Sequence, residues 1–201
     1  MKDQERKEST FDFGSQRAGN FKILIAFASQ YGSTGEVAEV VAEVLSQYGY
    51  AVDTKWIKDV TAVDHYDAVI VGSAIQYDKW MPEAVDFVKT HQKAFSKIPV
   101  AYFFTCLTLA KRNVKTEQQA LAYADKLIAL TTQVKPISIG RFAGVLDASK
   151  MSFLTRLMLK TITTVVGVRE GDYRDWDAIR SWAKSIDAKL SNEHAEMLEA
   201  G

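Results

Sequence analysis

The pattern of apolar and polar positions changes twice within a short stretch near the start of the chain. Residues 21–27, FKILIAF, form an almost continuous apolar run, which is typical of a strand buried on both faces of a parallel sheet. A polar stretch follows, SQYGST at 29–34, and apolar residues then recur at helical spacing with glutamates on the opposite face. Gly49 fits the position just past the helix end. The pattern therefore predicts a buried strand, a polar loop and an amphipathic helix.

The same alternation of strands and helices continues along the chain. The predicted strands cover residues 21–27, 50–57, 66–74, 98–105 and 134–142, and the later helices cover 82–88, 116–130 and 175–190. Pro82 suits a first helical turn, and Asp175 suits the N-cap of a helix whose apolar face ends at Leu190. This order predicts an α/β fold with a doubly wound five-stranded parallel sheet and right-handed crossovers. Ligands bind such sheets beyond the carboxyl ends of the strands, so the loops after strands one, three and four form the candidate site.

One segment between the fifth strand and the last helix does not fit the alternation. Residues 150–166 predict a helix with apolar residues around most of its circumference and basic residues in and around it. Two interpretations are open: peripheral contact of this helix with a membrane, or burial on the core or in a homo-oligomer. We expect a polar N-terminal tail over 1–20, a domain over 21–190 with this helical insert at about 143–170, and a C-terminal tail over 191–201.

Composition narrows the classes of function. The chain has 201 residues, which suits one domain, and its formal net charge of +0 gives no indication of nucleic acid binding. Cys106 is the single cysteine, so no internal disulfide can form and a reducing compartment is expected. The first residues lack the apolar run of a signal peptide, and no run is long enough to span a membrane. We therefore expect a cytoplasmic protein, at most peripheral to the inner face of the cell membrane.

The loop at 29–34 has the composition of a phosphate site. Its hydroxyls and the unpaired N–H groups of the next helix are donors, the helix dipole adds partial positive charge, and Gly32 allows a close approach. The Gly-Lys-Ser/Thr and G-x-G-x-x-G motifs are absent, so a terminal phosphate on a mononucleotide is favoured over ATP or NAD. The alternative is that Ser33 and Thr34 only cap the helix.

These features resemble the flavodoxin family. A strand ending in FAS, the loop SQYGST and a following helix resemble the FMN phosphate site of that family. The segments VGSAIQYDKWMPEAVDFVK, YFFTCLTLAKR and FAGVLD, with the apolar basic helix before YRDWDAI, are similar to the FMN-dependent, menaquinone-linked protoporphyrinogen dehydrogenase family. The resemblance covers about residues 21–190 and implies a flavodoxin-like sheet with the strand order 2-1-3-4-5.

The resemblance implies an FMN-dependent oxidoreductase that oxidises protoporphyrinogen IX to protoporphyrin IX in heme biosynthesis, with a quinone as electron acceptor. The residues that it implies around FMN are Ser29, Gln30, Tyr31, Gly32, Ser33, Thr34, Ser73, Ala74, Ile75, Gln76, Tyr77, Thr105, Cys106, Leu107, Thr108, Leu109 and Ala110. Tyr77 and Trp80 are candidates for stacking on the flavin, the alternative being loop aromatics that close the surface. Lys111, Arg112 and Arg141 are candidates for contacts with porphyrinogen propionates, the alternative being solvated charges. No catalytic base is indicated.

The cysteine and the histidines indicate no further chemistry. Cys106 is expected to be a small core residue, with contact to the flavin as the alternative. His65, His91 and His194 have no carboxylate or cysteine at ligand spacing, so we expect surface positions and no metal site.

Three other functions remain open. A flavodoxin-type electron-transfer protein is disfavoured by the neutral charge, since such flavodoxins are typically very acidic. An NAD(P)H–quinone reductase would need a nicotinamide site, which these loops do not indicate. An interaction module with this topology would bind no FMN at all.

Overall fold

A computed structural model describes residues 21–147, 149 and 169–199, with side chains described to residue 192. The polar tail predicted at 1–20 and the helix predicted at 150–166 lie outside the described residues.

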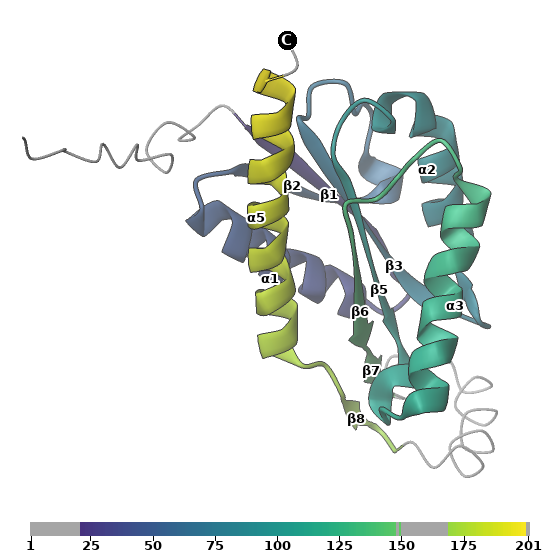
Figure 1. The fold of residues 1–201 in the computed structure, drawn as a ribbon. Coiled ribbons are helices and arrows are strands. Elements are labelled where there is room, and N and C mark those ends of the chain that lie inside the picture. Colours follow the sequence, from purple (N-terminus) through teal and green to yellow (C-terminus); the bar gives the residue numbers. More distant parts are fainter. Residues whose placement is uncertain (1–20, 148, 150–168, 200–201) are drawn as a thin grey trace, which may run out of the picture.

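The centre of the molecule is a parallel sheet (Figure 1). Its strands are β1 (Lys22–Ala28), β2 (Ala51–Trp56), β3 (Ala68–Gln76), β5 (Val100–Cys106) and β6 (Ser138–Ala143). They lie in the order β2-β1-β3-β5-β6, and the short β4 (Lys79–Trp80) pairs antiparallel with the end of β3. Counted along the chain without β4, this is the predicted order 2-1-3-4-5, so the fold prediction is confirmed.

The apolar runs form strands because both faces of the sheet are covered. Along β1, Leu24 belongs to the core on one face, whereas Ile23 and Ile25 belong to the core on the other. Every residue of β5 is buried. Helices α2 (Pro82–Phe95) and α3 (Val114–Leu130) cover the first face, and α1 (Ser33–Gln47) and α5 (Trp176–Glu199) cover the second (Figure 1).

The helix ends largely follow the sequence signals. Pro82 lies in the first turn of α2, and Gly49 after α1 has φ +88°, which glycine adopts without strain. The side chain of Asp175 accepts from the N–H of Ala178 at 2.9 Å, as expected of an N-cap. The prediction that the last helix ends at Leu190 is wrong, because the following residues, mostly good helix formers, extend α5 to Glu199.

Two short strands lie where the chain leaves the sheet for the insert and returns from it. β7 (Val145–Leu146) follows β6 almost directly and pairs antiparallel with β8 (Gly171–Asp172), which precedes α5. The pairing holds the two ends of the intervening segment together at the carboxyl edge of the sheet. The fold also contains two 3₁₀ turns, η1 (Ile57–Asp59) and η2 (Leu107–Ala110).

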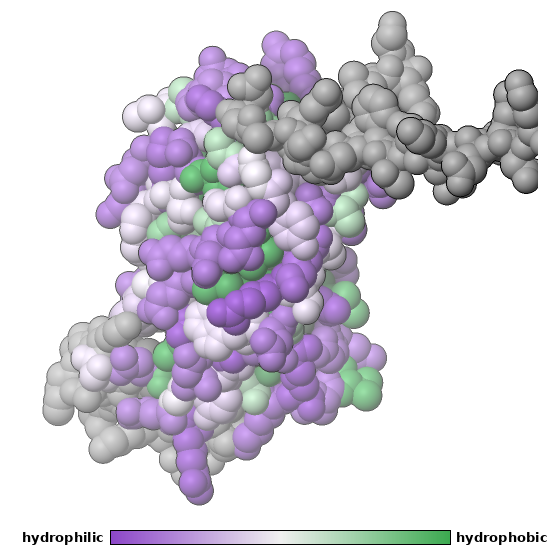
Figure 2. All heavy atoms as spheres, turned by 90° about the vertical axis from the view of Figure 1, so that its left-hand side faces the viewer, coloured by the Kyte–Doolittle hydropathy of each residue, from purple (hydrophilic) through white to green (hydrophobic). Residues whose placement is uncertain are grey.

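The surface on the α1 and α5 side is mainly hydrophilic, with apolar side chains in small separate areas (Figure 2). This agrees with both helices turning their apolar faces inward. Within the described ranges, no helix is both long enough and apolar enough to cross a membrane.

Candidate functional site

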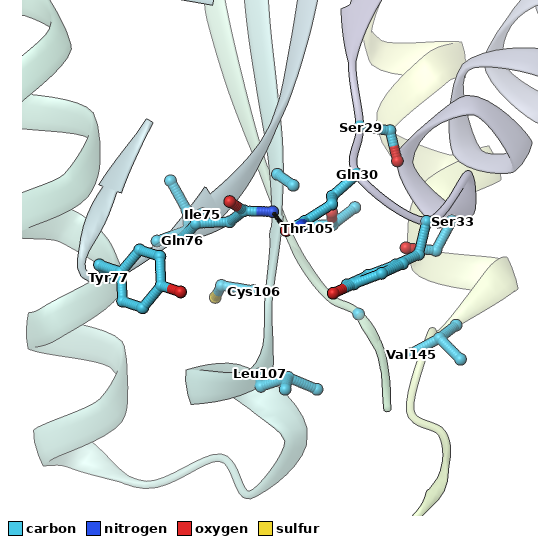
Figure 3. A pocket seen from close by; sticks show the side chains of 13 residues that line it. Ser29, Gln30, Ser33, Ile75, Gln76, Tyr77, Thr105, Cys106, Leu107 and Val145 are labelled. Carbon is cyan, nitrogen blue, oxygen red and sulfur yellow. Dashed lines mark hydrogen bonds between the residues drawn. The ribbon is translucent and has the colours of Figure 1, made fainter. Parts of the chain in front are cut away.

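A cavity of about 250 Å³ lies at the carboxyl ends of β1, β3 and β5 (Figure 3). Strand order reverses between β1 and β3, so this is the switch point where doubly wound sheets bind ligands. The lining residues are Ser29, Gln30, Tyr31, Ser33, Ala74, Ile75, Gln76, Tyr77, Thr105, Cys106, Leu107, Gly144 and Val145.

The loop between β1 and α1 turns sharply into the helix. Gly32 is the N-cap of α1 with φ +90°, a conformation that costs other residues strain, and its N–H donates to Ser29 Oγ at 3.0 Å. The first backbone bond of this helix runs from the N–H of Glu36 to the carbonyl of Gly32. No described side chain caps the helix, which contradicts the alternative that Ser33 and Thr34 serve only as caps. The N–H groups ahead of Glu36 are therefore available to a ligand.

Thr34 connects the start of α1 with the second half of the sheet. Its hydroxyl lies 2.9 Å from that of Thr105 at the end of β5, and both residues are buried. Thr34 thus does not line the cavity, whereas the neighbouring Ser33 does. The bond fixes the start of α1 relative to β5, and so fixes two walls of the cavity.

The second wall is the hairpin between β3 and β4. Its two loop residues, Tyr77 and Asp78, both have positive φ, 49° and 60°, as a type I′ turn requires. Asp78 is held by hydrogen bonds from the Tyr123 hydroxyl and Gln119 of α3. Tyr77 lines the cavity although its side chain is 94% exposed, so it offers an open aromatic face. The turn is therefore held by α3, and it presents its backbone and one exposed ring to the cavity.

A hydrogen bond joins the first two walls across the cavity. The amide of Gln76 donates to the amide oxygen of Gln30, so the loop after β1 and the end of β3 are held together (Figure 3).

The third wall, the turn after β5, is apolar on its inner side. Burial raises the pKa of the Cys106 thiol to about 11, so this group is neutral at physiological pH. Thr108 points away from the cavity and lies 3.1 Å from the Tyr123 hydroxyl. Burial, reinforced by Asp78, raises the pKa of Tyr123 to about 12. Tyr123 thus remains a neutral donor that ties the second and third walls to α3.

Some residues predicted around FMN lie behind the lining. These are Gly32, Thr34, Ser73, Thr108, Leu109 and Ala110. Ser73 Oγ accepts from the N–H of Met81 at 3.0 Å and so braces the hairpin, while Leu109 is buried in the core.

Two aromatic predictions are corrected. Trp80 does not stack over the cavity: it is buried, and its indole N–H donates to the carbonyl of Tyr123 at 2.9 Å. His91 is not a free surface residue, since it packs against Phe87 and Phe95, and burial lowers its pKa. Among the residues that the structure describes, no three potential metal ligands lie together.

The three basic residues predicted to contact the substrate, Lys111, Arg112 and Arg141, do not line the cavity. Arg112 and Arg141 converge on one carboxylate, with Arg112 Nη1 3.0 Å and Arg141 Nη1 3.5 Å from the oxygens of Glu117. Lys111 is exposed. The group carries more positive than negative charge, although both guanidinium groups already have a partner.

Sequence reasoning missed two lining residues and one supporting residue. Gly144 and Val145 line the cavity and follow β6, the fifth strand of the parallel sheet. The carboxyl ends of all five parallel strands lie at the same edge of the sheet, so the position after the fifth strand could have indicated these two residues. Arg174 was also missed. It donates to the carbonyl of Ser33, and nothing in the sequence placed these distant residues together.

Comparison with known proteins decides the family. Residues 24–171 match the model of the family described as "Flavodoxin domain". The chain belongs to the flavodoxin-domain family. Members of this family typically bind FMN. The solved structure of a short-chain flavodoxin associated with a non-canonical PDU bacterial microcompartment has the same fold, with a TM-score of 0.55 at 11% identity over 85% of this chain and 99% of that one.

The curated relatives of this flavodoxin-domain chain carry one name. The protoporphyrinogen IX dehydrogenase [quinone] of Escherichia coli (strain K12) is 27% identical over 172 residues, which cover 82% of this chain and 94% of the relative. A protein of the same name from Leishmania major is also 27% identical, over 83% of this chain and 75% of the relative.

The donors on the cavity wall fit the phosphate of FMN. The uncapped start of α1 and the hydroxyl of Ser33 supply neutral donors and a helix dipole, which suit a dianion without a lysine. The apolar walls at Ile75 and Leu107 suit a flat ring system. The residues present are therefore compatible with the cofactor that is typical of the family.

Proposed function

We propose that the chain is an FMN-dependent oxidoreductase of the protoporphyrinogen dehydrogenase type, with a quinone as electron acceptor. The observation that carries the proposal is the uncapped N-terminus of α1, which opens into the cavity at the sheet's switch point. By contrast, α3 begins with a complete capping box between Asn113 and Thr116, and α5 begins with the Asp175 cap. The helix that faces the cavity thus leaves its N–H groups for a ligand.

The phosphate would bind at Ser29–Thr34 through backbone N–H groups and the Ser33 hydroxyl. The ring system would lie between the hairpin residues 74–77 and the turn 105–107, with Gly144 and Val145 closing the side next to the insert. Tyr77 is the one aromatic of the two predicted that remains suitable for stacking, because Trp80 is in the core.

FMN supplies the redox chemistry when bound, since its ring accepts and releases hydrogen equivalents, and the protein's residues orient and shield it. The neutral, buried Cys106 and the apolar side chains beside it exclude water from that wall. The hydrogen bonds through Tyr123 keep the hairpin and the turn after β5 at a fixed separation. Among the described residues, the lining that would hold the ring contains no charged side chain.

The substrate class is supported by the relatives' printed names and by charge. A porphyrinogen with carboxylate side chains would approach past Arg112, Arg141 and Lys111. Together with Glu117 these side chains carry a net positive charge, which attracts carboxylates. Residues 150–166 lie between β7 and β8 in the sequence, and this segment is the proposed contact with the quinone or the membrane.

The cofactor part is tested by comparing FMN with riboflavin, which lacks the phosphate. In Ser33→Ala, the loss of one hydrogen bond to a charged group, roughly 1.5–3 kcal/mol, should weaken FMN binding by about 10- to 150-fold. Riboflavin binding should not change. Ser46→Ala, at the exposed far end of the same helix, is the matched control. Wild-type protein that binds no FMN would refute the proposal.

The enzymatic part is tested with the FMN-loaded protein, a menaquinone analogue and protoporphyrinogen under anaerobic conditions. Porphyrin formation that requires the quinone is the expected result. Fast single-electron exchange with redox proteins, without porphyrin formation, would instead indicate an electron-transfer flavodoxin.

A further inference from the structure

Arg174 is a buried arginine whose contacts converge behind the phosphate loop. It lies between β8 and α5, and its side chain is only 7% exposed. Nε and Nη2 donate to the two carboxylate oxygens of Asp172 at 2.9 and 2.6 Å. Nη1 donates to Glu36 at 2.7 Å and to the carbonyl of Ser33 at 3.3 Å. The guanidinium group also lies over the ring of Trp176, with its central carbon 4.3 Å from the ring centre.

These contacts hold the start of α1 through the carbonyl of Ser33 and the side chain of Glu36. The side chain of Ser33 lines the cavity, whereas its carbonyl oxygen faces Arg174. A guanidinium bound to that oxygen polarises the peptide group, which makes the N–H of Thr34 a better donor. Asp172 belongs to β8, which pairs with the strand that contains the lining residue Val145. One side chain thus joins the phosphate loop with another part of the cavity wall.

The charges matter as much as the positions. Glu36 lies in the first turn of α1, close in sequence to the N–H groups that would bind a dianion, and the loop itself contains no lysine or arginine. A free carboxylate there would repel the phosphate, and the repulsion would be strong in a partly buried setting. Burial lowers the pKa of Arg174, but the hydrogen bonds to Asp172 and Glu36 outweigh this and leave it raised, so the group stays charged and screens Glu36.

We propose that Arg174 is a positioning residue that sets the preference of this chain for a phosphate-bearing flavin, by holding Ser33 and neutralising Glu36. This inference rests on the proposed binding of FMN. Its distinguishing consequence is selectivity: Arg174 acts on the phosphate and not on the ring. A purely structural clamp between α1 and α5 would affect FMN and riboflavin alike.

The test measures the dissociation constants of FMN and riboflavin by fluorescence titration of the full chain. In Arg174→Gln, FMN binding should weaken at least tenfold and riboflavin binding should change less than twofold. Adding Glu36→Gln to this variant should recover several-fold of the FMN affinity, because it removes the freed carboxylate. Arg180→Gln, an exposed arginine on α5, is the matched control and should change neither constant.

Arg174→Lys provides a second variant that keeps the charge and loses the two-pronged contact with Asp172, so it should lie between wild type and Arg174→Gln in FMN affinity. It also serves if Arg174→Gln does not fold. Equal loss of FMN and riboflavin affinity, or no loss of either, would overturn the inference while leaving the proposed cofactor in place. Wild-type protein without FMN affinity would overturn both.

Discussion

Replacing Thr34 by valine removes a hydroxyl while keeping the shape of the side chain. In the native protein that hydroxyl lies 2.9 Å from the hydroxyl of Thr105, and the two residues are 0% and 3% exposed. The variant leaves the Thr105 hydroxyl buried without this partner. Thr34→Val should therefore destabilise the fold, and Thr105→Val should do so for the same reason.

The size of the effect follows from the cost of an unpaired buried polar group, which is roughly 1–3 kcal/mol. A value of about 2 kcal/mol corresponds to a fall in Tm of about 4–8 °C for a chain of this length. In the double variant, both partners are replaced by apolar groups of the same shape, which is close to neutral. We therefore expect the double variant to be more stable than either single variant.

The assay is urea unfolding of the FMN-free protein, so that ligand binding does not contribute to stability. The four proteins form a double-mutant cycle, and its coupling energy measures the hydrogen bond. Strictly additive effects would refute the bond. Thr34 does not line the cavity, so Thr34→Val should weaken the binding of FMN and the binding of riboflavin by the same factor, in contrast to Ser33→Ala.

Three further predictions concern the core and the surface. In Gly72→Ala, the added Cβ would lie 2.2 Å from the ring of Phe103, so the unfolding free energy should fall by about 1–3 kcal/mol, and Phe103→Leu should recover part of it unless the strand simply shifts. With a pKa of about 11, the Cys106 thiol should react with Ellman's reagent at pH 8 far more slowly in native than in unfolded protein, and rapid native labelling would contradict its burial. The hydrogen bonds of Arg174 lower the pKa of Asp172, so their contribution is present above its unfolded pKa of about 3.9 and is lost as the pH falls through the lower folded pKa. The stability difference between wild type and Asp172→Asn should therefore shrink below about pH 4, and a difference independent of pH would contradict the ion pair.

The buried parallel sheet could be predicted because the apolar runs are long and continuous, whereas the strand order 2-1-3-4-5 was implied by the resemblance to the flavodoxin family. Strands such as β5 are buried on both faces, and only a sheet covered by helices on each side accommodates them. Boundaries were less certain: β6 begins at Ser138, four residues after the predicted start, and Pro136, which has no N–H to donate, lies just before it.

The loops after β1, β3 and β5 could be predicted to form the cavity, because they follow the carboxyl ends of neighbouring strands, whereas the way their side chains lie required the tertiary structure. Tyr77 and Asp78 adopt positive φ although neither is glycine, which no local signal indicated. Trp80 follows that turn, and the hairpin turns its indole into the core, where Tyr123 accepts its N–H. Val145 lines the cavity from β7, and β7 pairs with β8, a strand far from it in the sequence.

The pairing of β7 with β8 has a consequence for variation among related chains. It returns the polypeptide to the point where it left the sheet. The entropy of closing such a loop grows only slowly with its length. We therefore expect related chains to differ in the length and sequence of residues 148–168 while they keep the pairing of β7 with β8.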